Sequence, residues 1–346
     1  MKRIMLCIIL CMVIFLAGCQ NADPQQSEQA QETAAPMPVF ALVVKDTVNP
    51  YMQVMYNGFQ KGCAEIGATP VIAGPDAEGT PTQQQAILNL IDQGVAAICI
   101  AANNRDELSA ALQQALAQGI TVISLDSAVY PEDRMLHIEQ APADVVGRVL
   151  IQAGSSILGG KGQFVILTTT KNAPNQTIWL SWMEKELADK PEDYAGLTLL
   201  QIAYGEDDYN ISYQVTMDLL DTYPDLDLII SPTSVGLLAS ADAITAAGAD
   251  VKVTGLGLPS DMQTHIISGV CPWMYLWNPS DLGYLAVYAA NLISEGKLTD
   301  TAGAIFTAGS LGERIISTSA DGGTEVVLDN PIMFDITNVA VWAELF

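Results

Sequence analysis

The stretch AILNLIDQGVAAICIA, residues 86–101, decides the fold because it holds a helix pattern and then a strand pattern. Its first half places four apolar residues on one helical face, namely Ala86, Ile87, Leu90 and Ile91. Gly94 suits the left-handed position that commonly ends a helix. The apolar run that follows carries no charged residue, which is typical of a strand buried on both faces. The stretch therefore predicts one helix-to-strand unit of a parallel sheet.

The same unit recurs along most of the chain. Gly119 ends a second helix pattern 25 residues after Gly94, and another apolar strand follows it. Strands are predicted at residues 39–44, 69–73, 95–101, 120–125, 163–168, 198–203, 228–231, 252–255 and 274–277. Helices are predicted at residues 51–66, 82–93, 107–118, 179–188, 213–223, 237–247, 262–268 and 282–294. So many strands exceed one comfortable open sheet, and we expect an α/β fold of two doubly wound parallel-sheet lobes.

The composition excludes several classes of protein. The 346 residues carry 14 Lys and Arg against 39 Asp and Glu, a net charge of −25 that nucleic-acid phosphates would repel. Since 50% of the residues are apolar and only 15% are charged, the chain is not disordered as a whole. The histidines are His137 and His265 only, and no GxGxxG or GxSxG motif is present. We therefore expect no enzyme, no cofactor, no metal and no nucleic-acid partner, and we expect a monomer.

Residues 1–18 have the pattern of an export signal. A short cationic start precedes an apolar run from Ile4 to Leu16 that is too short for a membrane-spanning helix. The following LAGC, which ends at Cys19, resembles the lipobox of bacterial lipoproteins. This resemblance implies cleavage before Cys19 and lipidation of its thiol, and an ordinary export signal is the alternative. Residues 19–38 lack aromatic side chains and predict a lipidated cysteine followed by a disordered tether.

Polar and aromatic side chains follow the carboxyl ends of the predicted strands, where ligands bind in open α/β sheets. Opposite charges, amides and hydroxyls gather there, with the rings of Tyr51 and Trp277 nearby. Such a set suits a small, neutral, polyhydroxylated ligand that stacks on an aromatic ring. The positions selected on this basis are Lys45, Tyr51, Asn103, Asn104, Asp126, residues 168–176, residues 232–234, Gly257, Trp277 and Asn278.

Several motifs resemble the sugar-type, ribose-binding-like substrate-binding proteins of bacterial ABC importers. They are VFALVVK at 39–45 with NPY at 49–51, NLIDQGVAAI at 89–98, SLDS at 124–127, PNQ at 174–176 and LWNP at 276–279. The match runs from about Val39 to the C-terminus and is nearest to the rhamnose-binding and autoinducer-2-binding branch. The resemblance implies a type I periplasmic binding protein, in which ligand is gripped between two lobes joined by three chain crossings.

The resemblance also implies ligand contacts for particular residues. Lys45 matches a lysine that donates to ligand oxygens, and Asp126 matches an aspartate that accepts from hydroxyls. Contacts from the second lobe are implied for Asn175, Gln176, the carbonyl of Pro232, and Ser234. Autoinducer-2 binders carry Asp-Gln where this chain has Asn175-Gln176, whereas the rhamnose-like branch carries Asn-Gln. This difference favours a rhamnose-like deoxyhexose.

The implied lobes are discontinuous in sequence. We expect an N-terminal lobe of residues 39–127 plus 279–300 and a C-terminal lobe of residues 128–278 plus 308–346. The crossings are expected near Ser127, near Asn278, and between Thr299 and Gly309.

The expected partners follow from the same resemblance. They are a small sugar, the permease and ATPase subunits of an ABC importer, and the membrane through the lipid on Cys19. The expected location is extracytoplasmic, on the outer face of a Gram-positive cell or facing the periplasm. Two alternatives stay open: an autoinducer-2 binding protein, and a sensory lipoprotein that presents a sugar-like signal to a receptor kinase.

Three cysteines lie in the body of the chain, at Cys63, Cys99 and Cys271. None has the spacing of a metal site. Cys99 lies inside an apolar run and predicts a buried, reduced thiol. The sequence leaves open whether Cys63 and Cys271 form a disulfide.

Overall fold

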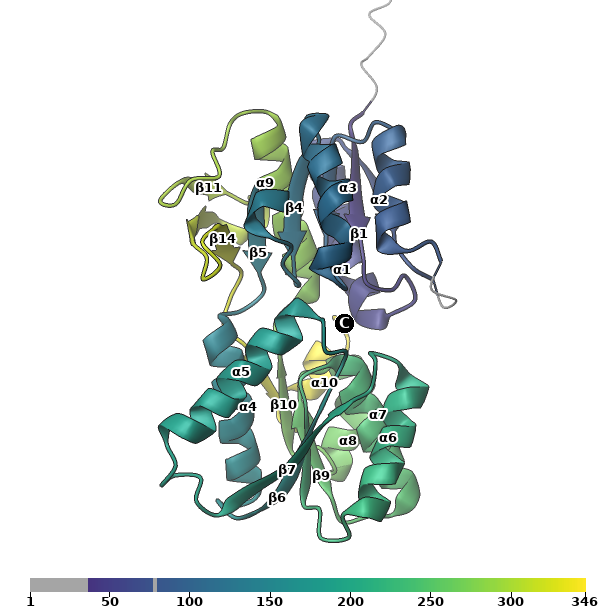
Figure 1. Ribbon diagram of the computed structural model, residues 1–346, viewed down its shortest axis with the longest axis vertical. Coiled ribbons are helices and arrows are strands. Elements are labelled where there is room, and N and C mark those ends of the chain that lie inside the picture. Colours follow the sequence, from purple (N-terminus) through teal and green to yellow (C-terminus); the bar gives the residue numbers. More distant parts are fainter. Residues whose placement is uncertain (1–36, 77–79) are drawn as a thin grey trace, which may run out of the picture. The chain divides into compact units, whose positions relative to one another are not determined.

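The computed structural model describes residues 37–76 and 80–346 (Figure 1). The expected signal peptide, Cys19 and nearly all of the expected tether lie outside these residues. The two main sheets of the described chain have seven and four strands, all parallel except for one edge pair of the larger sheet, with helices packed on them. The predicted α/β fold of two lobes is therefore confirmed. Among the described residues, no helix has the length and apolar character needed to cross a membrane.

The first lobe is built on the seven-stranded sheet. Its strands are β1 (Val39–Val43), β2 (Thr69–Ala73), β3 (Ala97–Ile100), β4 (Thr121–Leu125), β5 (Leu136–Glu139), β13 (Ser317–Thr318) and β14 (Thr324–Val327). They lie in the order β13-β14-β5-β4-β3-β1-β2, and all neighbours are parallel except β13 and β14. Phe40 and Leu42 of β1 join one apolar cluster, while Ala41 and Val43 join another. This alternation shows that both faces of the sheet are covered.

Four helices cover the first sheet: α1 (Pro50–Ile66), α2 (Gln83–Asp92), α3 (Arg105–Ala117) and α9 (Pro279–Ser294). Helices α1 and α9 are far apart in sequence but pack closely against each other. A Cβ atom at Gly58 of α1 would collide with the backbone carbonyl of Ser280, and one at Gly283 would collide with the carbonyl of Met55. Only glycine allows the two backbones to approach this closely.

The second lobe is built on the four-stranded parallel sheet. Its strands are β6 (Gly162–Thr168), β7 (Leu197–Tyr204), β8 (Leu228–Ser231) and β9 (Lys252–Gly255), in the order β7-β6-β8-β9. Beside β9, β10 (Trp273–Leu276) pairs antiparallel with β15 (Ile332–Asp335). The helices of this lobe are α4 (Ala143–Ile157), α5 (Pro174–Asp189), α6 (Tyr209–Thr222), α7 (Ser234–Ala247), α8 (Pro259–Ser268) and α10 (Val339–Trp342). A separate hairpin joins β11 (Ile305–Thr307) to β12 (Glu313–Ile315).

Proline and glycine set several helix ends. Proline stands at the start of α1, α5, α8 and α9, where its missing N–H costs no helical hydrogen bond. Gly67, Gly248 and Gly269 end α1, α7 and α8 in the left-handed conformation. These local signals explain why most helices could be placed from the sequence.

The strand order corrects two of the three expected crossings. β5 pairs with β4, and β14 pairs with β5, so both strands belong to the first lobe and not to the second as expected. The described chain therefore passes between the lobes near residues 140–142, 277–278 and 328–331. Only the expected crossing near Asn278 agrees. The error arose because β5 is short and mixed in character, and because it pairs with a strand almost two hundred residues away.

The three body cysteines Cys63, Cys99 and Cys271 are buried, free thiols. The predicted buried thiol of Cys99 is confirmed. The disulfide that the sequence left open is not formed. Burial raises the pKa of the Cys63 thiol to about 12, so this group is not a reactive thiolate.

A buried carboxylate holds two helices of the second lobe together. Glu186 of α5 is inaccessible to solvent and accepts hydrogen bonds from Arg148, Gln152, Lys190 and Tyr194 at 2.5–3.0 Å. Burial works against ionisation of Glu186. The four donors outweigh this effect and lower its pKa to about 2.

Replacing Glu186 by Gln should lower the free energy of unfolding at neutral pH by about 1–3 kcal/mol, because charge-assisted hydrogen bonds are lost. A lowered pKa means that the carboxylate stabilises the fold above its unfolded pKa. This stabilisation disappears as the pH falls toward about 2. Urea denaturation across this acid range should therefore show parent and variant converging. Asp189→Asn, on the exposed end of the same helix, is the control and should change the free energy of unfolding little. If Glu186→Gln lowers the free energy of unfolding equally at every pH, the ionised Glu186 carboxylate is not the stabilising group.

Candidate functional site

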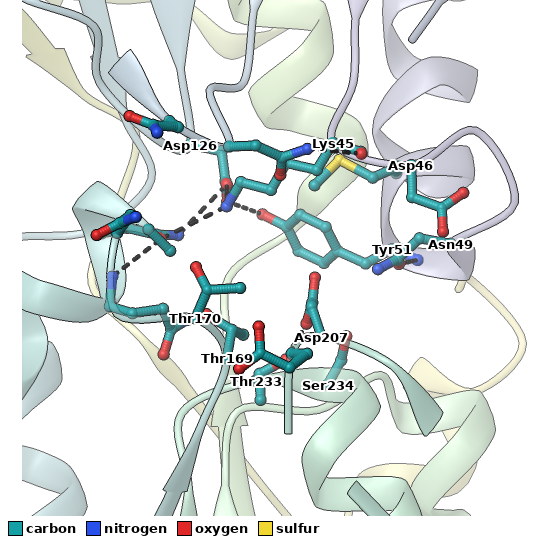
Figure 2. A pocket seen from close by; sticks show the side chains of 18 of the residues that line it. Lys45, Asp46, Asn49, Tyr51, Asp126, Thr169, Thr170, Asp207, Thr233 and Ser234 are labelled. Atoms are coloured by element: carbon teal, nitrogen blue, oxygen red, sulfur yellow. Dashed lines mark hydrogen bonds and ion pairs between the residues drawn. The ribbon is translucent and has the colours of Figure 1, made fainter. Parts of the chain in front are cut away.

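A cavity of about 620 Å³ is lined by residues that follow the carboxyl ends of strands in both sheets (Figure 2). This volume is typical of small-molecule sites. Among the described residues, the non-glycine positions with left-handed backbone are Asp126, Glu206 and Asp207, and all three line the cavity. Strained backbone of this kind gathers at functional sites. The walls include Lys45, Asn49, Tyr51, Gln83, Asn103, Asp126, Thr169, Asn175, Gln176, Trp179, Glu206, Asp207, Pro232, Thr233, Ser234 and Trp277.

The Asp126 carboxylate, directly after β4, is the centre of the first-lobe wall. Its Oδ2 lies 2.8 Å from Lys45 Nζ, and its Oδ1 accepts a hydrogen bond from the Tyr51 hydroxyl at 3.1 Å. Trp277 Nε1 donates to the same hydroxyl at 2.7 Å. The side chains of Lys45 and Asp126 are 11% and 4% exposed. Water therefore screens this ion pair poorly, and its geometry is well defined.

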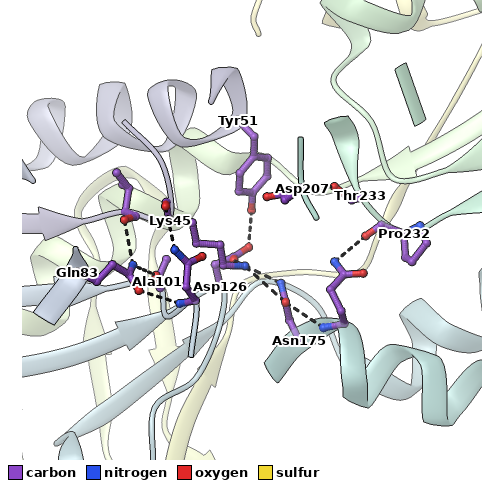
Figure 3. Close-up of polar contacts among 12 residues, drawn as sticks. Lys45, Tyr51, Gln83, Ala101, Asp126, Asn175, Asp207, Pro232 and Thr233 are labelled. Carbon is purple, nitrogen blue, oxygen red and sulfur yellow. Dashed lines mark hydrogen bonds and ion pairs between the residues drawn. The ribbon is translucent and has the colours of Figure 1, made fainter. Parts of the chain in front are cut away.

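Amide side chains fix the backbone on both sides of Lys45 (Figure 3). Gln83 Nε2 donates to the carbonyls of Val44 and Ala101, which directly follow β1 and β3, at 2.9 and 2.7 Å. The Asn103 N–H donates to Gln83 Oε1, and Asn103 Nδ2 donates to the Lys45 carbonyl at 2.9 Å. The predicted site residue Asn103 thus positions Lys45 through its backbone.

Asn49 and Pro50 place Tyr51 in the first turn of α1. The Asn49 side chain accepts from the Tyr51 N–H at 2.9 Å, and Pro50 occupies the first helical position. Burial, and after it the charge of Asp126, raises the pKa of Tyr51 well above its ordinary value. The hydroxyl therefore stays protonated and remains a donor to Asp126.

Asn175 of α5 reaches from the second lobe to the first (Figure 3). Its Nδ2 donates to Asp126 Oδ2 at 3.4 Å, and Lys45 Nζ donates to its Oδ1 at 3.5 Å. Both distances are at the long limit for hydrogen bonds, so these contacts are weak. The oxygen atoms of a ligand could replace them with shorter bonds.

Gln176 and Pro232 contact each other in the second-lobe wall. Gln176 Nε2 donates to the Pro232 carbonyl at 2.9 Å, and Thr168 Oγ1 donates to Gln176 Oε1 at 2.7 Å. Both ends of this buried amide are therefore engaged, and Gln176 holds the ends of β6 and β8 together. The Pro232 carbonyl keeps a second lone pair for a further donor. Ser234, the first residue of α7, lies beside it in the cavity wall.

Trp277 forms an aromatic wall with Tyr51 and Trp179. The Tyr51 and Trp277 rings are perpendicular with centroids 6.4 Å apart, and the Trp179 and Trp277 rings are 5.7 Å apart at 52°. Trp277 is only 2% exposed, and its N–H is used by Tyr51. Its position agrees with the predicted aromatic surface, while stacking on a ligand stays a prediction.

The structure brings together eight of the nine residues predicted to contact a ligand, and Asn278 is the exception. Asn278 caps α9: its Oδ1 accepts from the N–H of Ser280 at 3.0 Å, and its Nδ2 donates to Asp281 at 2.7 Å. A strand-end asparagine that precedes a helix suits either role, and capping is the role seen here.

Sequence analysis missed Gln83, Trp179 and Asp207, which also line the cavity. Gln83 and Trp179 lie within predicted helices, so their patterns indicated packing rather than a site. Asp207 follows β7 and fits the strand-end rule that selected the other residues. The left-handed turn that aims it into the cavity has no reliable sequence signal.

Two parallel-sheet lobes joined by three crossings, with a polar cavity at their carboxyl edges, define a two-lobed solute-binding protein. Residues 40–298 match the family described as periplasmic binding protein domain, and the chain belongs to this family. The predicted membership of the sugar-type binding proteins of bacterial ABC importers is confirmed, and this family binds solutes for transport rather than catalysing a reaction.

Particular relatives refine this picture. An ABC transporter solute-binding protein from Clostridium phytofermentas, solved with bound L-rhamnose, is 37% identical with a TM-score of 0.86, covering 90% of this chain and 100% of that one. LsrB from Clostridium saccharobutylicum in complex with AI-2 shares the fold at 22% identity and a TM-score of 0.82, covering 88% and 99%. The ribose import binding protein RbsB of Bacillus subtilis (strain 168) is 23% identical, covering 86% of this chain and 95% of its own.

Replacing Lys45 by Met should lower the free energy of unfolding by about 3–5 kcal/mol, because it leaves the Asp126 carboxylate buried without a counter-charge. The double variant Lys45→Met with Asp126→Asn should lose less free energy of unfolding than Lys45→Met alone, since no unpaired charge remains. Urea denaturation of both single variants and the double variant gives the coupling energy. Strictly additive effects would mean that the pair does not interact in solution.

Proposed function

We propose that this chain captures a rhamnose-like deoxyhexose as the lipid-anchored, extracytoplasmic binding component of an ABC importer. The observation that carries the proposal is the set of matched donors and acceptors that both lobes present to one cavity, centred on Asp126 and Lys45 opposite Asn175. The similarity to an L-rhamnose-bound protein at 37% identity supports it.

The ion pair of Lys45 and Asp126 offers a sugar both kinds of hydrogen-bond partner. A hydroxyl group donates one hydrogen and accepts others. Asp126 accepts and Lys45 donates, so two neighbouring hydroxyls can bind to the pair in one orientation. Asn175 adds a donor and an acceptor from the second lobe. A neutral ring with several hydroxyls satisfies all of these groups at once.

Ligand binding is then coupled to hinge closure. A sugar that bonds to both walls is bound most tightly when the lobes are close together, and it selects that arrangement. The long contacts of Asn175 with Lys45 and Asp126, at 3.5 and 3.4 Å, would give way to shorter bonds through the ligand. A permease that recognises the closed arrangement thereby distinguishes loaded from empty protein.

Autoinducer-2 is the alternative ligand, because LsrB in complex with AI-2 shares the fold at a TM-score of 0.82. Asn175 argues for the sugar. The Asn175 amide lacks the charged acceptor oxygens of an aspartate but has an NH2 group that donates hydrogen bonds. This NH2 group can donate to a sugar hydroxyl.

Calorimetric titration of the purified protein tests the proposal. L-Rhamnose should bind at least about tenfold more tightly than D-ribose, L-arabinose or autoinducer-2. A thermal-shift screen with the same compounds should show the largest stabilisation with L-rhamnose. Tight binding of autoinducer-2 alone would support the alternative, and binding of no sugar in either assay would overturn sugar capture.

Asn175→Asp should shift the preference from L-rhamnose toward autoinducer-2 by at least about tenfold, because it restores the carboxylate typical of autoinducer-2 binders. Titration of parent and variant with both ligands measures the ratio of the two Kd values. Asn210→Asp makes the same change at an exposed position of the second lobe outside the cavity, and should leave the ratio as it is. An unmoved ratio in Asn175→Asp would show that this residue does not set selectivity.

The lipid anchor rests on the LAGC sequence that ends at Cys19. Cys19→Ser should abolish labelling by a fatty-acid analogue in a bacterial host and move the protein out of the membrane fraction, because two or more acyl chains are needed for stable attachment. Cys11→Ser, inside the apolar run of the signal, is the matched control and should keep both the fatty-acid labelling and the membrane attachment. Labelling that survives in Cys19→Ser would contradict lipidation at this residue.

A further inference from the structure

A tight turn after β7 brings a carboxylate into the second-lobe wall. The Asp208 N–H donates to the Gly205 carbonyl at 2.9 Å and closes the turn. Glu206 and Asp207 at its tip have φ angles of 55° and 56°, the left-handed values of a type I′ turn. Thr233 Oγ1 donates to Asp207 Oδ1 at 2.7 Å and fixes the side chain in place.

Asp207 faces the charged groups of the first lobe. Figure 2 shows it below Tyr51, on the side of the cavity opposite Asp126. Burial raises the pKa of Asp207, the charge of Lys45 opposes this, and the charge of Asp126 adds to it. Thr233 uses only one of the sites at which a carboxylate can accept a hydrogen, so Asp207 keeps capacity for donors from a ligand.

Two buried polar atoms in the same wall have no hydrogen-bond partner among the described residues. They are Thr169 Oγ1 and Trp179 Nε1. The two side chains are 5% and 2% exposed, and both line the cavity. A buried donor without an acceptor destabilises the protein, and the hydroxyl of a ligand would satisfy it. The second-lobe wall thus offers an acceptor in Asp207, a donor in Trp179 and a hydroxyl in Thr169.

The charges around the cavity are mostly negative. Its lining includes six carboxylates, from Asp46, Asp76, Glu107, Asp126, Glu206 and Asp207. Lys45 is the single cation among the lining residues that the structure describes, and it is paired with Asp126. An anionic ligand would therefore meet a negative field that no second cation among these lining residues relieves.

We propose that Asp207 is a specificity-determining residue, which accepts hydroxyl hydrogens of a neutral sugar from the second lobe and excludes sugar acids. The inference rests on the proposed sugar-binding function and adds the ligand class. A ring hydroxyl next to Asp207 donates to it and accepts from Trp179 or Thr169. A carboxylate in that place has no hydrogen to donate and is repelled, which is discrimination by an unfavourable contact.

Two matched ligand pairs test this inference. L-Mannose and L-mannuronate share the ring hydroxyls of L-rhamnose and differ from each other only at C6, in a hydroxymethyl or a carboxylate group. L-Rhamnitol and L-rhamnonate differ in the same way at C1, where the first has a hydroxymethyl group and the second a carboxylate. For at least one pair, the parent protein should bind the acid at least about 100-fold more weakly than its neutral partner. Asp207→Asn, which suits the left-handed backbone, should narrow that ratio at least about tenfold while still binding L-rhamnose.

The control is Asp208→Asn, which removes a charge from the same turn outside the cavity and keeps the cap of α6, since Asn caps as well as Asp. Its ratios should equal those of the parent. Asp207→Gly, which also tolerates a positive φ, should lower the ratio of the Kd of the acid to the Kd of its neutral partner in the same way. It replaces Asp207→Asn as the test if that variant does not fold.

The outcomes separate this inference from the proposed function. Binding of L-rhamnose by the parent with ratios that neither Asp207 variant moves would overturn the role of Asp207 and leave sugar capture standing. If Asp208→Asn lowers the ratio of acid to neutral Kd as much as Asp207→Asn does, the role of Asp207 is also overturned. The discrimination would then come from the total negative charge of the turn and not from a contact of Asp207 with the ligand. If the parent binds none of these neutral sugars, the proposed function fails and the inference fails with it.

Discussion

The organising constraint of this structure is a negative charge kept out of water at the end of β4. Asp126 is 4% exposed, Lys45 lies 2.8 Å from its carboxylate, and the Tyr51 hydroxyl donates to it. Its backbone adopts a φ of 62°, a conformation that an aspartate holds only where its surroundings enforce it. The first turn of α1 places Tyr51 within hydrogen-bond distance of the Asp126 carboxylate. The close packing of α1 on α9 fixes α1 in this position.

The same carboxylate is connected to a crossing between the lobes. Trp277, which lies in the crossing between β10 and α9, donates to the hydroxyl of Tyr51, which in turn donates to Asp126. Asn278, the next residue, caps α9. A ligand that changes the hydrogen bonds of Asp126 therefore acts on a chain of contacts that ends at the hinge. This continuity gives a physical reason why occupancy of the cavity and the arrangement of the lobes should depend on each other.

The sequence predicted what local patterns specify. Apolar runs and capping glycines placed most parallel strands and helices, and the strand-end rule with the family resemblance selected eight of the residues that line the cavity. It could not place β5 in the first lobe, because that assignment depends on pairing with β4 and β14, and nothing within residues 136–139 encodes the pairing. It gave Asn278 a ligand role because a cap and a ligand contact require the same residue type. Asp207 was missed because a backbone turn, and not the side chain alone, aims it into the cavity.

The acidic composition that argues against nucleic-acid binding also acts inside the cavity. Asp126 and Asp207 stand on opposite walls, and burial makes their mutual repulsion harder to screen. In empty protein the charge of Lys45 acts on Asp207 more strongly than that of Asp126 and offsets this repulsion, and the long contacts of Asn175 bridge the two walls only weakly. In the proposed function, hydroxyl groups placed between the two carboxylates donate to both and so hold the loaded lobes together. An anion placed there would strengthen the repulsion instead. Closure would then be driven by neutral hydrogen-bond donors and opposed by negative charge, which joins selectivity and conformational change in one electrostatic mechanism.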